Sequence, residues 1–134
     1  MKALNLRTLF ATLIIALVSF TSCSKKNEDT VPPHPIVGTW EGNYDGKEVY
    51  YAFVLKANGT MDVFEGQTKE TVSKGSGAWK LEGQTFTAVY SYDDNPDHKL
   101  NVAAKISEDF KTMSGAYGVG TVSADDGDYF MTKK

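Results

Sequence analysis

From residue 36 to the end of the chain, short stretches of alternating apolar and polar residues are separated by tight-turn residues. The clearest stretch runs from 85 to 92, where every second residue is apolar or aromatic: Phe86, Ala88, Tyr90 and Tyr92. A period of two places these side chains on one face of a β-strand. No stretch has the 3.6-residue period of an amphipathic helix, so the pattern predicts an all-β domain.

Eight stretches of this kind follow one another. We expect strands at 38–44, 49–56, 60–65, 78–82, 85–92, 100–106, 113–119 and 128–133. Asp45-Gly46 and Asn58-Gly59 are typical of tight hairpin turns, and segment 66–75 is either a long hairpin loop or a frayed strand end. Eight antiparallel strands with short connections predict a closed up-and-down β-barrel, whose interior is just filled by side chains or holds one small ligand.

Two strands have unusual faces. The stretch 49–56 is apolar on both sides, so we expect its outward residues, Tyr50 and Val54 among them, to be covered. In the stretch 113–119, the alternation predicts that Met113, Tyr117 and Val119 share the inner face with Gly115.

The first 22 residues have the pattern of a signal peptide. Lys2 and Arg7 are followed by the apolar run 9–20 and then by small residues. A membrane-spanning helix needs about 20 apolar residues, and this run is shorter. We therefore expect residues 1–22 to be removed.

Cys23 is the only cysteine, so no disulfide forms within the chain. Phe20 to Cys23 resembles the lipobox of bacterial lipoproteins. That resemblance implies that Cys23 carries acyl chains such as palmitate, which anchor the protein to a membrane. The charged residues Lys25, Lys26, Glu28 and Asp29 either form an ordinary linker or resemble the signals that send some Gram-negative lipoproteins to the outer face of the outer membrane, which implies exposure at the cell surface. Residues 23–35 are polar and then proline-rich, and we expect a disordered tether before the domain at 36–134.

The charge balance excludes one class of partner. Residues 23–134 contain 12 lysines, no arginine and 17 acidic residues, a formal charge of 12 minus 17, or −5. Without a basic surface or an arginine to contact phosphates, nucleic-acid binding is not expected.

Catalytic and metal-binding patterns are also missing. His98 is the single histidine of the domain, and no serine motif has the spacing of a nucleophile elbow. The acidic loop 93–98 has oxygen ligands of the kind that bind calcium, but its spacing is that of ordinary turns. We expect no enzyme activity, no metal site and no cofactor.

Gly38-Thr39-Trp40 at the start of an eight-strand meander resembles the lipocalin and lipocalin-like families, part of the calycin group. In those barrels the tryptophan closes one end, often beneath an arginine, and here Lys133 or Lys105 is the candidate to replace that arginine. Avidin-type biotin pockets need several tryptophans, and only two are present. Fatty-acid-binding proteins insert a helical lid after the first strand, where this chain has Asp45-Gly46.

The aromatic inner face gives the leading hypothesis of a non-enzymatic protein that binds a small apolar or aromatic ligand. The residues expected to line the ligand site or the barrel core are Trp40, Tyr44, Tyr51, Phe53, Trp79, Phe86, Tyr90 and Tyr117. The alternative is a filled barrel that acts through its surface, as a protein-interaction or inhibitor module.

Overall fold

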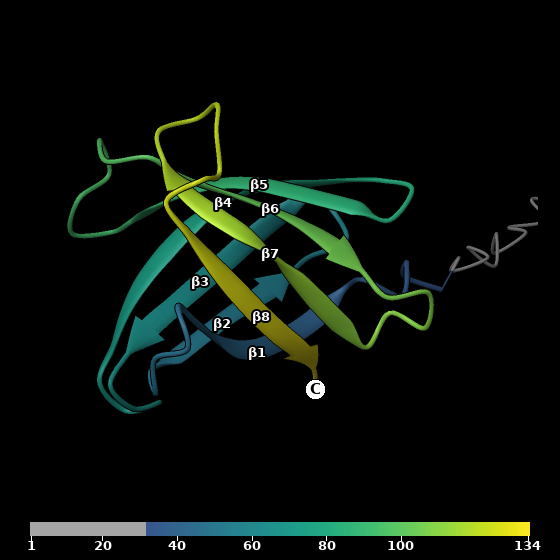
Figure 1. Ribbon diagram of the computed structural model, residues 1–134, viewed down its shortest axis with the longest axis horizontal. Helices are drawn as coiled ribbons and strands as arrows, with labels where there is room; N and C mark the ends of the chain where they lie inside the picture. Colours follow the sequence, from purple (N-terminus) through teal and green to yellow (C-terminus); the bar gives the residue numbers. More distant parts are fainter. Residues whose placement is uncertain (1–31) are drawn as a thin grey trace, which may run out of the picture. The chain divides into compact units, whose positions relative to one another are not determined.

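A computed structural model describes residues 32–134 (Figure 1). The predicted signal peptide, Cys23 and the first part of the tether lie outside the described residues. Within residues 32–134, no helix is long and apolar enough to cross a bilayer.

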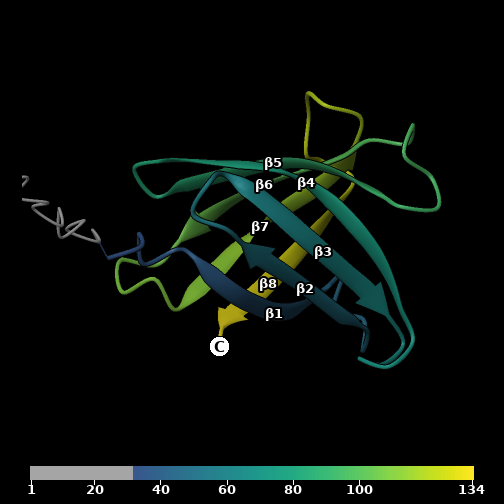
Figure 2. The same cartoon turned by 180° about the vertical axis from the view of Figure 1, so that it is seen from behind.

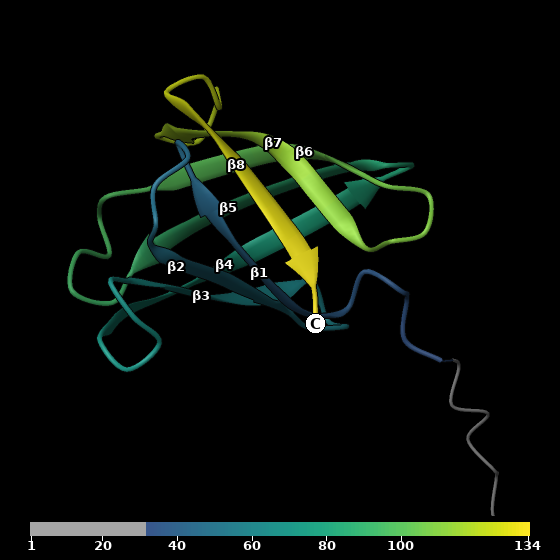
Figure 3. The same cartoon turned by 60° about the horizontal axis from the view of Figure 1, so that its bottom comes forward.

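Eight β-strands make up the described domain. They are β1 (Gly38–Tyr44), β2 (Tyr50–Leu55), β3 (Thr60–Gly66), β4 (Val72–Glu82), β5 (Thr85–Tyr92), β6 (Leu100–Ile106), β7 (Thr112–Val119) and β8 (Gly127–Lys133). Each strand pairs antiparallel with the next, and β8 pairs with β1 to close the barrel (Figure 3). The predicted eight-stranded up-and-down barrel is confirmed, and closure leaves no free edge strand.

The strand boundaries differ from the prediction mainly in β4. This strand begins at Val72, so the β3–β4 connection is only 67–71 and the long loop considered for 66–75 does not form. A Cβ atom at Gly77 would lie 2.1 Å from the carbonyl oxygen of Val89. Glycine therefore permits the close approach of β4 to β5, and the polar segment 73–77 continues as a strand.

Two further residues differ in detail from the expectation. Val49 lies outside β2, because its N–H donates to the Lys47 carbonyl as part of the turn that follows β1. Val119 is on the same side of the sheet as its register partner Leu100, as the alternation predicts, but it is 57% exposed rather than buried. It is the last residue of β7, beyond the point where the strand still lies over the core.

The two ends of the barrel have different connections. The connections 45–49, 67–71, 93–99 and 120–126 lie at one end, which we call the mouth, and the connections 56–59, 83–84 and 107–111 lie at the other, which we call the closed end. In Figure 1 the β3–β4 and β5–β6 connections are at the left, and the β4–β5 and β6–β7 connections are at the right. Figure 2 shows β2 and β3 side by side from the opposite direction.

The barrel interior is filled over most of its length. Its largest fully buried side chains are Trp40, Phe53, Phe86, Ile36, Leu55, Met61, Met113 and Met131. Flexible methionines fill the irregular space between the aromatic rings. A ligand therefore has no room near the closed end, and the mouth is where space remains.

Candidate functional site at the barrel mouth

A cavity of about 200 Å³ opens inside the mouth of the barrel. Its lining residues come from six strands and are Tyr44, Tyr51, Glu65, Tyr90, Leu100 and Tyr117. Each is an inward position at the mouth end of its strand, so the alternation that fills the core also builds this site. The volume corresponds to about six or seven water molecules, which suits a small ligand or one group of a larger one.

Glu65 is the charged residue of this cavity. It follows Met61 and Val63 at a spacing of two, so its side chain points inward from β3. Its Oε1 accepts a hydrogen bond of 2.5 Å from the Tyr44 hydroxyl, and its Oε2 accepts one from the Tyr92 hydroxyl. Both carboxylate oxygens are thus held in place by phenols.

The remaining phenols of the cavity are also hydrogen-bonded. The Tyr51 and Tyr90 hydroxyls lie 2.8 Å apart in the buried part of the mouth. The Tyr117 hydroxyl donates to Asp45 Oδ2 at 2.6 Å. Edge-to-face contacts of Tyr44 with Tyr51 at 5.4 Å and with Tyr117 at 5.7 Å fix the rings against one another. The site is therefore ordered before any ligand arrives.

This arrangement keeps the phenols protonated. Donation to Glu65 is the main reason that the pKa of Tyr44 is raised above its ordinary value. Burial raises the pKa values of Tyr51, Tyr90 and Tyr92. Donation to Asp45 raises the pKa of Tyr117 to about 12. The tyrosines consequently act as neutral hydrogen-bond donors and aromatic walls, with no phenolate available as a base.

A second, polar hollow of about 370 Å³ adjoins the cavity on the side of the β3–β4 connection. Tyr44 and Glu65 line both spaces, while Thr71, Ser73 and Asp94 line only the outer one. Glu65 therefore stands between an aromatic inner cavity and a polar vestibule.

The eight aromatic residues named from the sequence fall into two groups. Trp40, Phe53 and Phe86 are fully buried core residues that do not line the mouth cavity. Trp79 is half-buried, and its Nε1 donates to the carbonyl oxygens of Lys56 and Thr60, so it holds the β2–β3 turn.

The other four named residues, Tyr44, Tyr51, Tyr90 and Tyr117, line the mouth cavity. Glu65 and Leu100 of the lining were not among the named residues, nor was Tyr92, which bonds Glu65. The spacing of two from Met61 and Val63 was the available signal for Glu65, and aromatic content alone does not reveal it.

The closed end is formed around Trp40. Its Nε1 donates to the Ile36 carbonyl at 2.8 Å, and both residues are fully buried. Lys133 pairs with Trp40 in the strand register, and its Nζ donates to the Pro35 carbonyl. Lys105, the other candidate to replace the missing arginine, is exposed and donates to Thr85.

A glycine-flanked tryptophan thus closes one end of an eight-stranded meander. The barrel is lipocalin-like.

No known protein-family profile and no curated protein matches the chain. Among solved structures, Treponema pallidum Tp0751 (Pallilysin) is similar at 10% identity, with 75% of this chain and 80% of that chain covered and a TM-score of 0.49. A variant of the fluorescent protein UnaG is similar at 11% identity, with 75% and 96% covered and a TM-score of 0.43. The lipocalin-like architecture rests on the strand order and closure of the barrel itself.

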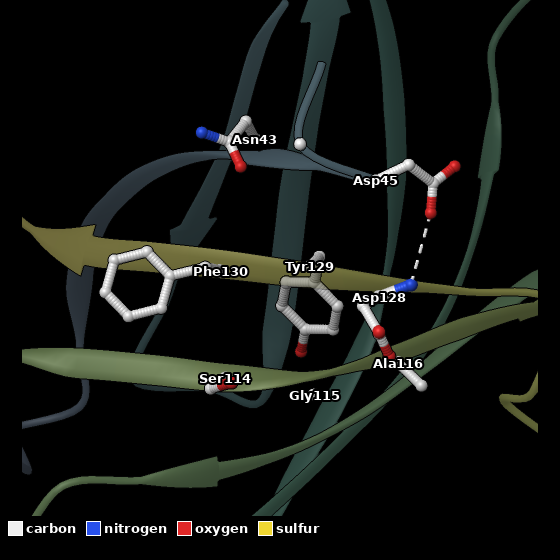
Figure 4. A pocket seen from close by; sticks show the side chains of 9 residues that line it. Asn43, Asp45, Ser114, Gly115, Ala116, Asp128, Tyr129 and Phe130 are labelled. Carbon is white, nitrogen blue, oxygen red and sulfur yellow. Dashed lines mark hydrogen bonds between the residues drawn. The ribbon is translucent and has the colours of Figure 1, made fainter. Parts of the chain in front are cut away.

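The outer surface has its own hollow, of about 740 Å³, over β1, β7 and β8 (Figure 4). Phe130, which is 46% exposed, lies there between its register partners Asn43 and Ser114. Small polar neighbours leave its ring uncovered.

Tyr50 is one of the outward residues of β2 that we expected to be covered. It is half-buried, its hydroxyl donates to Glu41 Oε1 at 3.2 Å, and Lys69 Nζ lies 5.1 Å from its ring centroid.

The acidic loop 93–98 forms consecutive turns. The Asn95 N–H donates to the Tyr92 carbonyl, and the His98 N–H donates to the Asn95 carbonyl. Across residues 32–134, no group of three or more histidine, cysteine, aspartate or glutamate side chains is arranged to hold a metal ion.

Proposed function

We propose that this protein is a lipid-anchored, lipocalin-like binding protein that takes up a small apolar or aromatic ligand at its barrel mouth. The observation that carries the proposal is the contrast along the barrel axis. Fully buried side chains such as Trp40 and Ile36 occupy the closed end, whereas the mouth retains a cavity of about 200 Å³ walled by four tyrosines. Preorganised aromatic walls with few polar groups are typical of small-molecule sites.

The anchor part of the proposal comes from the sequence. The lipobox resemblance at Cys23 and the proline-rich tether would hold the barrel near a membrane surface. Two or more acyl chains on one residue give a stable attachment.

Native mass spectrometry of residues 24–134 tests ligand binding directly. The expected result is a monomer that carries a co-purified small molecule. Leu100→Phe should abolish this adduct, because the larger side chain fills the cavity that Leu100 lines. Phe130→Ser, which alters the outer hollow instead, should leave it intact. Adduct loss in Phe130→Ser with retention in Leu100→Phe would contradict the proposal.

A second function is favoured by a different observation. The exposed Phe130 in the outer hollow offers an apolar contact point for a protein partner, as in a surface interaction or inhibitor module. A monomer that purifies empty and binds no small molecule at the mouth would favour this second function over the first.

A further inference from the structure

We infer that the mouth selects a small organic cation, an ammonium compound with an apolar or aromatic body. The inference rests on the proposed function, since it names the class of ligand for the same cavity. It follows from one carboxylate, four aromatic rings and the charge of the surrounding loops.

Glu65 faces the cavity and makes no ion pair with any cationic side chain of residues 32–134. The ion pairs among residues 32–134 use the acidic residues Glu41, Asp45, Asp62 and Asp109, and none of them reaches Glu65. Its two hydrogen bonds come from neutral phenols. A partly buried carboxylate held in this way interacts most favourably with a cation that also donates hydrogen bonds.

The tyrosines leave their rings, not their hydroxyls, for the ligand. All four cavity hydroxyls are bonded within the protein, to Glu65, to Asp45 or between Tyr51 and Tyr90. Aromatic rings attract cations through their quadrupole, within about 6 Å of the centroid. One cation already lies near such a ring: Lys47 Nζ is 5.0 Å from the Tyr44 centroid, while it pairs with Asp45.

The loops at the mouth are strongly acidic. The four connections 45–49, 67–71, 93–99 and 120–126 contain eight acidic residues and three lysines, a formal charge of 3 minus 8, or −5. The three connections at the closed end contain two lysines and two acidic residues and are neutral. This asymmetry draws cations toward the mouth and repels anions.

Three probes of nearly equal size test the charge requirement. Benzylammonium, benzyl alcohol and benzoate share one ring and differ in charge at neutral pH. Each is titrated into ¹⁵N-labelled residues 24–134, and binding is followed from the amide NMR signals of Glu65, Tyr90 and Leu100. We expect benzylammonium to bind at least about tenfold more tightly than benzyl alcohol, and benzoate to bind least.

Two variants separate the cavity charge from the general field of the loops. Glu65→Gln keeps the shape of the side chain and should reduce benzylammonium affinity about tenfold while leaving benzyl alcohol within about twofold. Glu48→Gln, an exposed change in the β1–β2 connection, should leave both affinities within about twofold. Thermal melts confirm that each variant is folded. If Glu65→Gln does not fold, Glu65→Asp retains the charge and should still prefer the ammonium.

The outcomes distinguish this inference from the proposed function. Equal or tighter binding of benzyl alcohol at the same amides would overturn cation selection and leave ligand binding at the mouth standing. A preference for benzylammonium that survives Glu65→Gln would also overturn it. No binding of any probe at millimolar concentration would overturn cation selection as well, while the mass-spectrometric adduct decides the proposed function separately.

Discussion

The hydroxyl of Tyr44 on β1 donates to the carboxylate of Glu65 on β3 at 2.5 Å, across the mouth of the barrel. These strands are not neighbours, because β2 lies between them. The bond is therefore made through the interior, between two inward side chains. It positions one aromatic wall of the cavity and the charged residue of the site at the same time.

Removing this bond should destabilise the protein. We expect Tyr44→Phe to lower the free energy of unfolding by about 1–2 kcal/mol in urea melts, because hydrogen bonds to charged groups contribute about 1.5–3 kcal/mol when buried and this one is partly exposed. Tyr50→Phe is the matched control, since its hydroxyl donates to Glu41 on the outside of the barrel. A loss in the control as large as in Tyr44→Phe would show that the mouth bond has no special role.

Trp40 should be the residue on which the closed end depends. Trp40→Ala leaves a large cavity in a fully buried position, and we expect a loss of about 3–5 kcal/mol in denaturant melts. Trp40→Phe retains most of the volume and loses the hydrogen bond to Ile36, so its cost should be smaller. A loss below about 1 kcal/mol in Trp40→Ala would mean that Trp40 is not a core residue.

Stability should fall steeply at alkaline pH. The pKa values of all seven tyrosines are raised above the ordinary value of 10.0, and burial is the largest cause for Tyr51 and Tyr129. The unfolded chain therefore loses phenol protons above pH 10, where the folded protein retains them. This contribution to stability is complete below pH 10 and decreases as pH rises beyond it, by about 1.4 kcal/mol per pH unit for a buried phenol such as Tyr51 or Tyr129 that stays protonated only in the folded state. The more exposed phenols contribute less because solvent screens them.

A spectrophotometric phenol titration checks this expectation. In denaturant all seven tyrosines should ionise near pH 10, whereas in the native protein the phenolate signal should appear only at higher pH, together with loss of structure. Tyrosines that ionise near pH 10 with the fold intact would contradict the hydrogen-bonded mouth.

The proposed anchor depends on one atom, the sulfur of Cys23. Cys23→Ala should move the protein from the membrane fraction to the soluble fraction, because the residue that would carry the acyl chains is lost. Ser22→Ala, which leaves the cysteine, is the control. Retention of Cys23→Ala in membranes would rule out the lipoprotein interpretation.

The period of two predicted the fold well because most strands alternate clearly, β5 above all, and the turns carry their own signals. Asp45 and Gly46 both have positive φ angles, as their Asp-Gly sequence suggested, and Gly59 does too. The start of β4 was missed because segment 73–77 is polar and glycine-rich, and only its pairing with β3 and β5 shows why it is extended.

The candidate site was predicted only in part. Four of its tyrosines follow from aromatic alternation, whereas Glu65 was not named because a single carboxylate at a strand end usually faces solvent. The alternation gives its inward direction only if β3 continues as far as Gly66, past the filled core. The sequence likewise left open whether the barrel is hollow, since that depends on how the buried methionines and rings pack at the closed end.

The most direct test of ligand binding at the mouth is to map where small aromatic molecules bind on ¹⁵N-labelled residues 24–134. A mixture of aromatic fragments is added, and changes in the amide spectrum are assigned to residues. We expect the shifts to cluster at Glu65, Tyr90 and Leu100 around the mouth cavity. Shifts confined to Ser114, Ala116 and Phe130 in the outer hollow would contradict the account.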